Sequence, residues 1–103
     1  MQLGFLERII QLCRDNDISL IFVTAPVAPV SLEIMDNYMY VHNTVREFAE
    51  SHNIPYLDFN IVLLEEGIFT NENFRDDAHL NFSGAEIACA FFVDWIRDLG
   101  YFN

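Results

Sequence analysis

Two aspartates and a histidine lie together in the stretch Asp76-Asp77-Ala78-His79, just before a polar helix start. This arrangement is similar to the acid and base of a hydrolytic triad, in which a histidine moves a proton beside a carboxylate. Two other interpretations stay open. The polar residues could satisfy backbone groups of a capped loop, or they could begin a metal site, which would need a third or fourth ligand.

The elements that must position these residues alternate between helices and strands. An apolar stripe at helical spacing predicts a first helix, and a run rich in β-branched residues and stopped by Pro26 predicts a buried parallel strand. The expected elements, in chain order, are a helix over 3–13, a strand over 18–26, a helix from Ser31 to about 51, a short strand over 56–59, a helical turn and loop over 61–75, and a helix from Asn81 or Ser83 to Gly100. This order predicts one α/β domain, residues 1–103, with parallel strands.

Local signals add detail to these elements. Ser31 is expected to cap the second helix, and Ser83 with Glu86 matches the capping box of the last helix. Cys13 and Cys89 lie within apolar patterns without the spacing of a metal or redox motif, and we expect both in the core as reduced residues. Two strands make a poor sheet. A further short strand, or strands from another chain, should therefore complete it.

The charge balance excludes several classes of partner. Sixteen acidic residues face five arginines and no lysine, which gives a net charge of −11. Nucleic acids and anionic membranes are poor partners for such a chain. No apolar run is long enough to span a membrane, and the charges in residues 1–17 do not fit a signal peptide. The compartment stays open.

The segment "DDAHLNFSGAE" resembles the last signature block of the SGNH/GDSL hydrolases, and the strands "LIFVTAP" and "PYLDFN" are similar to the elements before it. The resemblance covers the C-terminal part of that family's domain. It implies a partial flavodoxin-like three-layer fold with parallel strands flanked by helices. It also implies that His79 takes a proton from a serine hydroxyl while Asp76 fixes the imidazole tautomer. Asp77 has the right charge but not the family's spacing.

The nucleophile block and the oxyanion-hole blocks of that family do not occur in this chain. Its four serines lie in other contexts: Ser19, Ser31, Ser51 and Ser83. The resemblance therefore implies a half-site for an ester or acylated carbohydrate substrate that is inactive until an N-terminal half completes it, with no metal and no cofactor. The alternative is a non-catalytic interaction domain that forms a homodimer through its apolar sheet edge. His42 and His52 are expected on a solvated surface, and Arg75 in a local ion pair with the neighbouring aspartates.

Overall fold

The computed structural model describes residues 3–100. Five α-helices and one 3-10 helix account for most of this part of the chain. The α-helices are α1 (Leu3–Asp15), α2 (Pro29–Glu33), α3 (Tyr38–Ser51), α4 (Phe59–Glu66) and α5 (Phe82–Asp98). The strands are β1 (Phe22–Thr24), β2 (Tyr56–Asp58), β3 (Phe74–Asp76) and β4 (His79–Leu80), and the 3-10 helix η1 spans Asn71–Asn73.

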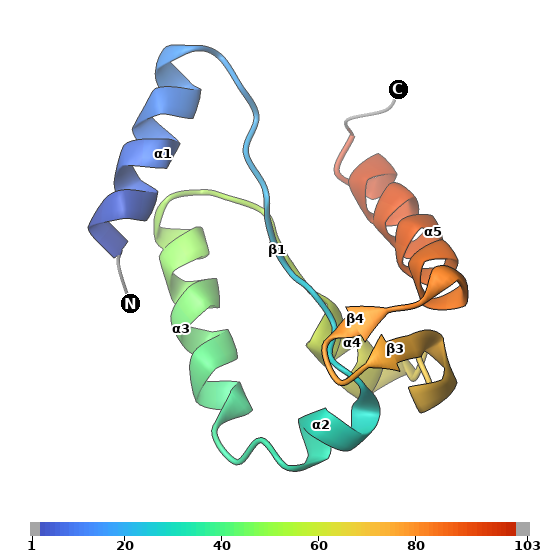
Figure 1. The fold of residues 1–103 in the computed structure, drawn as a ribbon. Coiled ribbons are helices and arrows are strands. Elements are labelled where there is room, and N and C mark those ends of the chain that lie inside the picture. Colours follow the sequence, from blue (N-terminus) through green and yellow to red (C-terminus); the bar gives the residue numbers. More distant parts are fainter. Residues whose placement is uncertain (1–2, 101–103) are drawn as a thin grey trace.

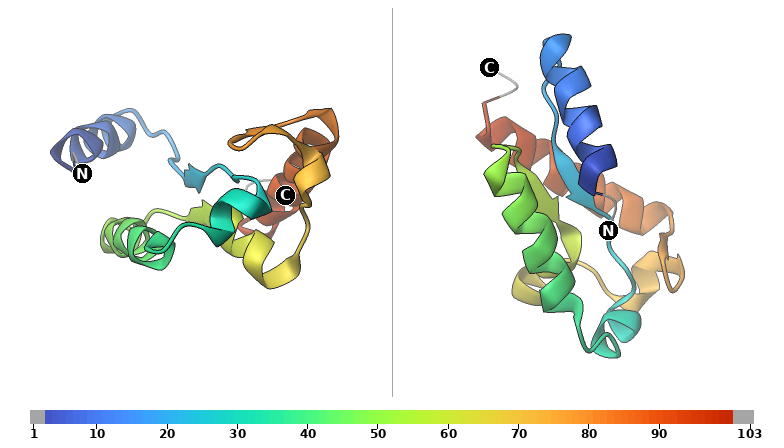
Figure 2. Two further views of the ribbon diagram at one scale, coloured as in Figure 1. Left: turned by 60° about the horizontal axis from the view of Figure 1, so that its bottom comes forward. Right: turned by 90° about the vertical axis from the view of Figure 1, so that its left-hand side faces the viewer.

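The central element is a parallel pair of strands covered by helices on both faces. β1 pairs with β2 in the register Phe22↔Tyr56, Val23↔Leu57 and Thr24↔Asp58. Helices α1 and α3 lie on one side of this pair, and α5 lies on the other side (Figures 1 and 2). The expected α/β character and the parallel strand pair are therefore confirmed.

Each face of the strand pair packs against its own apolar cluster. On the α1 and α3 side, the buried residues are Ile10, Phe48, Ala49 and Ile54. On the α4 and α5 side, they are Leu32, Leu57, Phe59, Val62, Leu63 and Phe69. Phe22 and Tyr56 extend the first cluster and Leu57 belongs to the second, because side chains alternate between faces along a strand.

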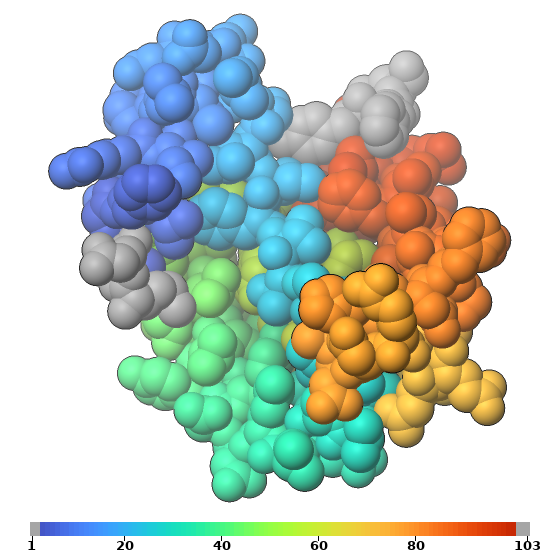
Figure 3. Space-filling model, viewed as in Figure 1, coloured from blue at the N-terminus to red at the C-terminus, as the bar shows by residue number. Residues whose placement is uncertain are grey.

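The first strand is much shorter than its sequence indicates. The expected strand 18–26 pairs only at Phe22–Thr24, and Ser19 lies before it in irregular backbone. Burial on both faces was also wrong, because Val23 is 45% exposed. The physical reason is that, within the described residues, β1 has a strand neighbour on one edge only, so Val23 lies at the open border of the sheet. Figure 3 shows the β1 segment at the surface, between the colours of α1 and α5.

The second expected helix is broken into two. Helix α2 begins after Ala28 with Pro29 at its first turn, so Ser31 lies inside the helix and is not its cap. Helix α2 ends at Glu33, and α3 begins after Asn37. Ile34, which the apolar stripe placed on the buried face, is 78% exposed in the connection. The spacing of apolar residues does not reveal such a break, because it stays helical across the residues that connect the two helices.

The chain after β2 is more ordered than expected. The helical turn in 61–75 is the two-turn helix α4, which Asp58 caps by accepting a hydrogen bond from the Asn60 N–H at 2.8 Å. The rest contains η1 and β3, which pairs antiparallel with β4. These are the additional strands that the sequence left open. They form a separate hairpin and do not extend the β1–β2 sheet.

The last helix begins at the earlier of the two expected positions. Asn81 is the N-cap of α5, and its side-chain oxygen accepts a hydrogen bond from the Gly84 N–H at 3.0 Å. The capping box of Ser83 and Glu86 was wrong, because the Ser83 hydroxyl donates to the Asn81 side chain instead. Asn is as good an N-cap as Ser, so sequence preference does not choose between them.

The two cysteines are free thiols, but neither is fully buried in the core. Cys13 is partly buried, whereas Cys89 is exposed on α5. The helix periodicity of α5 did place Phe91 and Trp95 against the buried cluster. Among the described residues, no helix combines the length and the apolar character needed to cross a membrane.

Candidate functional site

The hairpin of β3 and β4 brings Asp76 and His79 together. The two residues face each other across the strand pair, with Asp77 and Ala78 in the turn between them. The His79 Nδ1 atom lies 2.7 Å from Asp76 Oδ1 and 3.0 Å from Asp76 Oδ2. Both side chains are well exposed, at 63% for His79 and 53% for Asp76.

The turn itself stabilises the charge on Asp76. Its Oδ1 atom accepts a hydrogen bond from the Ala78 N–H at 3.0 Å. This bond, followed by the one from His79, lowers the pKa of Asp76 below its ordinary value. An ionised carboxylate only accepts hydrogen bonds, so the proton on His79 sits on Nδ1 and the lone pair sits on Nε2. The geometry thus suits a histidine that accepts a proton at Nε2.

The Asp76→Asn variant is expected to be less stable than wild type at neutral pH, and this difference should close in acid. A carboxyl group with a depressed folded-state pKa contributes stability above its unfolded-state value, and loses it as the pH falls through the folded-state value. The unfolded-state reference is 3.8. Urea unfolding of both proteins, from neutral pH down to about pH 2, measures the difference. A difference that stays constant below about pH 4 would contradict the assignment.

Backbone contacts connect this hairpin to the rest of the fold. The Ala28 N–H, in the loop after β1, donates to the Asp77 carbonyl at 2.9 Å. At the other end, the Asn81 N–H donates to the Asn73 carbonyl at 2.9 Å. The hairpin is therefore held beside the carboxyl end of β1. In open α/β sheets, ligands bind at the carboxyl ends of the strands.

No serine hydroxyl accompanies the pair in the part of the chain that the structure describes. The Ser83 hydroxyl is bonded to Asn81 and the Ser51 hydroxyl to the Phe48 carbonyl, and no serine contacts His79. Within residues 3–100, no group of three or more His, Cys, Asp or Glu side chains could hold a metal. No ion pair within 4.0 Å includes Arg75 among residues 3–100, and Asp76 pairs with His79 instead, although the charge of Arg75 also helps to lower the pKa of Asp76.

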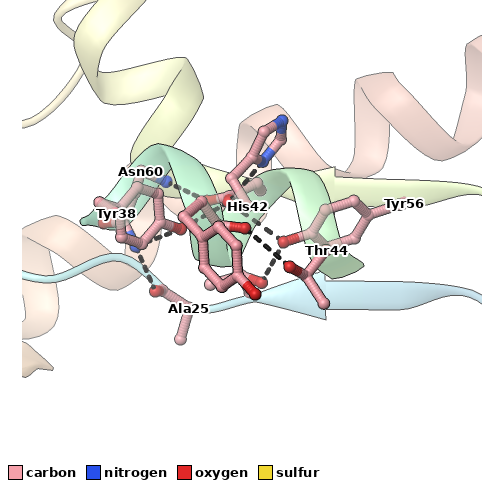
Figure 4. Close-up of polar contacts among 9 residues, drawn as sticks. Ala25, Tyr38, His42, Thr44, Tyr56 and Asn60 are labelled. Atoms are coloured by element: carbon pink, nitrogen blue, oxygen red, sulfur yellow. Dashed lines mark hydrogen bonds and ion pairs between the residues drawn. The ribbon is translucent and has the colours of Figure 1, made fainter. Parts of the chain in front are cut away.

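A second polar cluster surrounds Asp58, which is only 4% exposed at the end of β2. Its Oδ2 atom accepts hydrogen bonds from the Tyr38 hydroxyl at 2.5 Å, His42 Nδ1 at 2.9 Å and the Tyr56 hydroxyl at 3.1 Å. Its Oδ1 atom caps α4 through the Asn60 N–H. Figure 4 shows these side chains converging from α3 and β2. We call this set, Tyr38, His42, Tyr56, Asp58 and Asn60, the Asp58 cluster.

The Asp58 cluster also holds the loop after β1. Asn60 is 2% exposed. Its side-chain oxygen accepts a hydrogen bond from the Val27 N–H at 2.9 Å, and its amide donates to the Ala25 carbonyl at 3.3 Å and the Tyr38 hydroxyl at 3.0 Å. The same loop then bonds to the Asp77 carbonyl through Ala28. The cluster therefore supports the loop against which the Asp76 and His79 hairpin rests.

Sequence reasoning missed this cluster and placed one of its members wrongly. His42 was expected on a solvated surface, but its side chain is only 13% exposed and bonds to Asp58. Two observations in the sequence could have indicated the cluster. Tyr38 and His42 lie four residues apart on one face of α3, and Asp58 ends a strand where polar groups of α/β proteins gather. Only the packing of α3 against β2 joins these two observations.

Alkaline titration should detect the two tyrosines of the cluster. Burial and the Asp58 carboxylate raise the pKa of Tyr56 to about 12, and they raise that of Tyr38 well above its usual range. Groups with raised folded-state pKa values stabilise the fold below the unfolded-state value of about 10, and this contribution is lost as the pH rises further. Tyr56→Phe should remove the tyrosinate absorbance that develops near pH 12. An unchanged absorbance titration would contradict the assignment.

Comparison with known proteins places the chain in a family without assigning it an activity. A model of a family whose function is uncharacterised matches residues 1–100. The chain belongs to this family. None of the curated proteins and none of the solved structures matches it significantly. The match extends over nearly the whole chain.

Proposed function

We propose that the chain supplies the base His79 and its orienter Asp76 to an SGNH/GDSL-type hydrolase site. The nucleophilic serine and the oxyanion donors would come from another polypeptide segment. The substrate would be an ester, such as an acylated carbohydrate. The single observation that carries the proposal is the contact of His79 Nδ1 with both carboxylate oxygens of Asp76, at 2.7 and 3.0 Å, on an exposed hairpin.

The proposed reaction follows from the proton positions. The serine hydroxyl gives its proton to His79 Nε2 as its oxygen attacks the ester carbonyl, and Asp76 stabilises the resulting imidazolium. The imidazolium then protonates the departing alcohol, which leaves an acyl-serine. Water repeats the two steps with the same histidine, releasing the acid and restoring the serine. The exposure of the pair suits this role, because Nε2 has to meet a group from outside residues 3–100.

The open edge of β1 supports the finer fold assignment that we also propose. In a flavodoxin-like sheet the strand order is 2-1-3-4-5, so the last two strands are neighbours and the third strand lies beside the fourth. With β1 as the fourth strand and β2 as the fifth, the missing third strand would pair with the free edge of β1. The hairpin carrying Asp76 and His79 follows the fifth strand in chain order, as the resemblance requires.

The first test is the reading frame upstream of the Met1 codon. A strand followed by a Gly-Asp-Ser-like turn in the same frame would supply the nucleophile. The longer protein should then react with a fluorophosphonate, a serine-directed acylation mimic, and His79→Ala should slow this labelling by about 10²–10⁴-fold. His52→Ala is the matched control, because His52 contacts Phe48 and lies outside the hairpin. Labelling that is independent of His79 would refute the proposal.

The 103-residue chain alone should not hydrolyse short acyl p-nitrophenyl esters above the level of its His79→Ala variant. The expectation follows from the serine contacts, because no serine hydroxyl in residues 3–100 contacts the imidazole. Turnover that depends on His79 would mean that a different group in this chain acts as nucleophile.

A second candidate function is a non-catalytic interaction domain in which Asp76 and His79 only stabilise the hairpin. The specific observation in its favour is the exposed edge of β1 at Val23, which has no strand partner in the part of the chain that the structure describes. Its simplest form would be a homodimer, and light scattering at micromolar concentration measures it. Two results together would favour this candidate over the first. The dimer would persist in His79→Ala, and the reading frame upstream of Met1 would encode no hydrolase segment.

A further inference from the structure

Among residues 3–100, one edge of β1 has no strand partner, and this edge lies between two apolar grooves, one on each face of the sheet. On the α1 and α3 side, a groove of about 220 Å³ is lined by Leu6, Phe22, Val45 and Tyr56 together with the edge residues of β1. On the α5 side, a groove of about 270 Å³ is lined by Val23, Phe59, Ala88, Cys89 and Phe92. Val23 borders both, so the grooves flank the same edge.

The backbone at this edge is ready for another strand. The Phe22 N–H donates to the Pro55 carbonyl at 2.9 Å and so points towards β2. Because successive residues of a strand point their backbone groups to opposite edges, the N–H and C=O of Val23 point away from β2. An exposed edge with free donors and acceptors is a template for pairing with a further strand.

We propose that this edge binds an apolar β-strand, in parallel orientation, from a polypeptide segment of net positive charge. A strand placed there would have one groove against each of its faces, so its side chains on both faces should be apolar. Strands covered by helices on both sides read as continuous apolar runs, and such sheets are mostly parallel, as β1 and β2 already are.

The net charge of the whole chain, and not any residue that lines the grooves, favours one class of partner. At a net charge of −11, a segment bearing Lys or Arg beside its apolar run is attracted, whereas a second copy is repelled. Two copies related by a two-fold axis would also bring β1 against β1 in antiparallel orientation. The homodimer expected from the sequence is therefore the weaker occupant of this edge. This proposal rests on the fold assignment made above, in which a third strand would pair with the same edge of β1, and it states the chemistry of that strand. The surface would persist if His79 proved inactive, so the binding of a strand and the hydrolase activity can fail separately.

The test selects short random peptides, displayed on phage, against the purified chain. The selected peptides should share a continuous apolar run and flanking basic residues, and their binding should weaken with salt. Val23→Asp should weaken them about tenfold or more, because Val23 lies opposite Leu57 and the substitution puts a charge into the α5-side groove. Ile34→Asp is the matched control, since Ile34 is exposed but borders neither groove. It should bind the peptides as wild type does.

Thiol labelling gives a second readout that does not depend on a variant. A docked strand should slow the reaction of Cys89 with a disulfide reagent, because Cys89 lines the α5-side groove. Cys13, which lines neither of these grooves, should react at an unchanged rate. A spin label at the peptide N-terminus should broaden the NMR signals of Ile21 more than those of Ala25 if the strand is parallel.

Four results would overturn the proposal. They are binding that is insensitive to Val23→Asp, selected peptides that are acidic or alternate apolar with polar residues, an unprotected Cys89, and stronger broadening at Ala25. Self-association of the chain that Val23→Asp abolishes would instead identify a second copy as the occupant.

Discussion

Asp58→Ala should lower the free energy of unfolding by about 3–5 kcal/mol, because it removes the shared acceptor of a buried network. Four donors lose Asp58 as their acceptor: the Tyr38 and Tyr56 hydroxyls, His42 Nδ1 and the Asn60 N–H. The Tyr56 hydroxyl keeps its hydrogen bond with Thr24. Each buried donor left unsatisfied costs about 1–3 kcal/mol, and relaxation recovers part of the sum. Urea unfolding followed by circular dichroism measures the loss.

Two further variants separate the network from a general effect of losing an acid. Asp94→Ala removes an exposed carboxylate paired with Arg97 on α5, and should change stability by less than about 0.5 kcal/mol. Asp58→Asn keeps an oxygen for the Asn60 N–H but turns an amide towards the other donors. Its loss in free energy of unfolding should therefore lie between those of Asp94→Ala and Asp58→Ala. If Asp58→Ala costs no more than Asp94→Ala, the cluster does not stabilise the fold.

Gly84→Ala should be strongly destabilising although it lies in a helix, where alanine is normally preferred. A Cβ atom at this position would lie 2.2 Å from the Asn73 carbonyl oxygen and 2.7 Å from Leu80 Cδ2. The nearer atom belongs to the backbone of η1, so α5 and η1 have to separate. Overpacking of this kind typically costs about 1–3 kcal/mol, and backbone displacement places this case at the upper end.

Gly4→Ala is the matched control, because a Cβ at Gly4 meets nothing within 4 Å and the residue lies in α1. It should be neutral or stabilising by up to about 1 kcal/mol. The two variants can be compared by thermal unfolding. Gly84→Ala should also disturb the hairpin, because Asn73 accepts the Asn81 N–H that follows β4. NMR shifts at His79 should therefore move in Gly84→Ala and stay in place in Gly4→Ala.

The predictions that succeeded depend on neighbours in the chain. The stripe of α1, the short strand β2 and the face of α5 are local periodicities, and the structure contains all three. The Asp76 and His79 contact is local as well, since a hairpin turn is enough to form it. In such cases the backbone geometry of a single helix, strand or turn determines which side chains lie together.

The predictions that failed depend on which element lies beside another. The strand at 18–26 pairs along three residues because β2 supplies a partner only there. The break between α2 and α3 leaves Ile34 exposed, although its spacing fits the buried stripe. His42 was expected on the surface, but α3 packs against β2 and brings its side chain to Asp58. None of these neighbours is encoded by spacing within one segment.

The sequence by itself determined the alternation of helices and strands, the net acidic charge, and the local pair of Asp76 and His79. Only the tertiary structure decided that Asp58 is a buried hub and that the loop after β1 supports the hairpin. It also decided that one edge of β1, which lies between two apolar grooves, has no strand partner from residues 3–100. The reason is physical. Periodicity specifies which face of an element is apolar, whereas burial and hydrogen bonding depend on contacts between residues far apart in the chain.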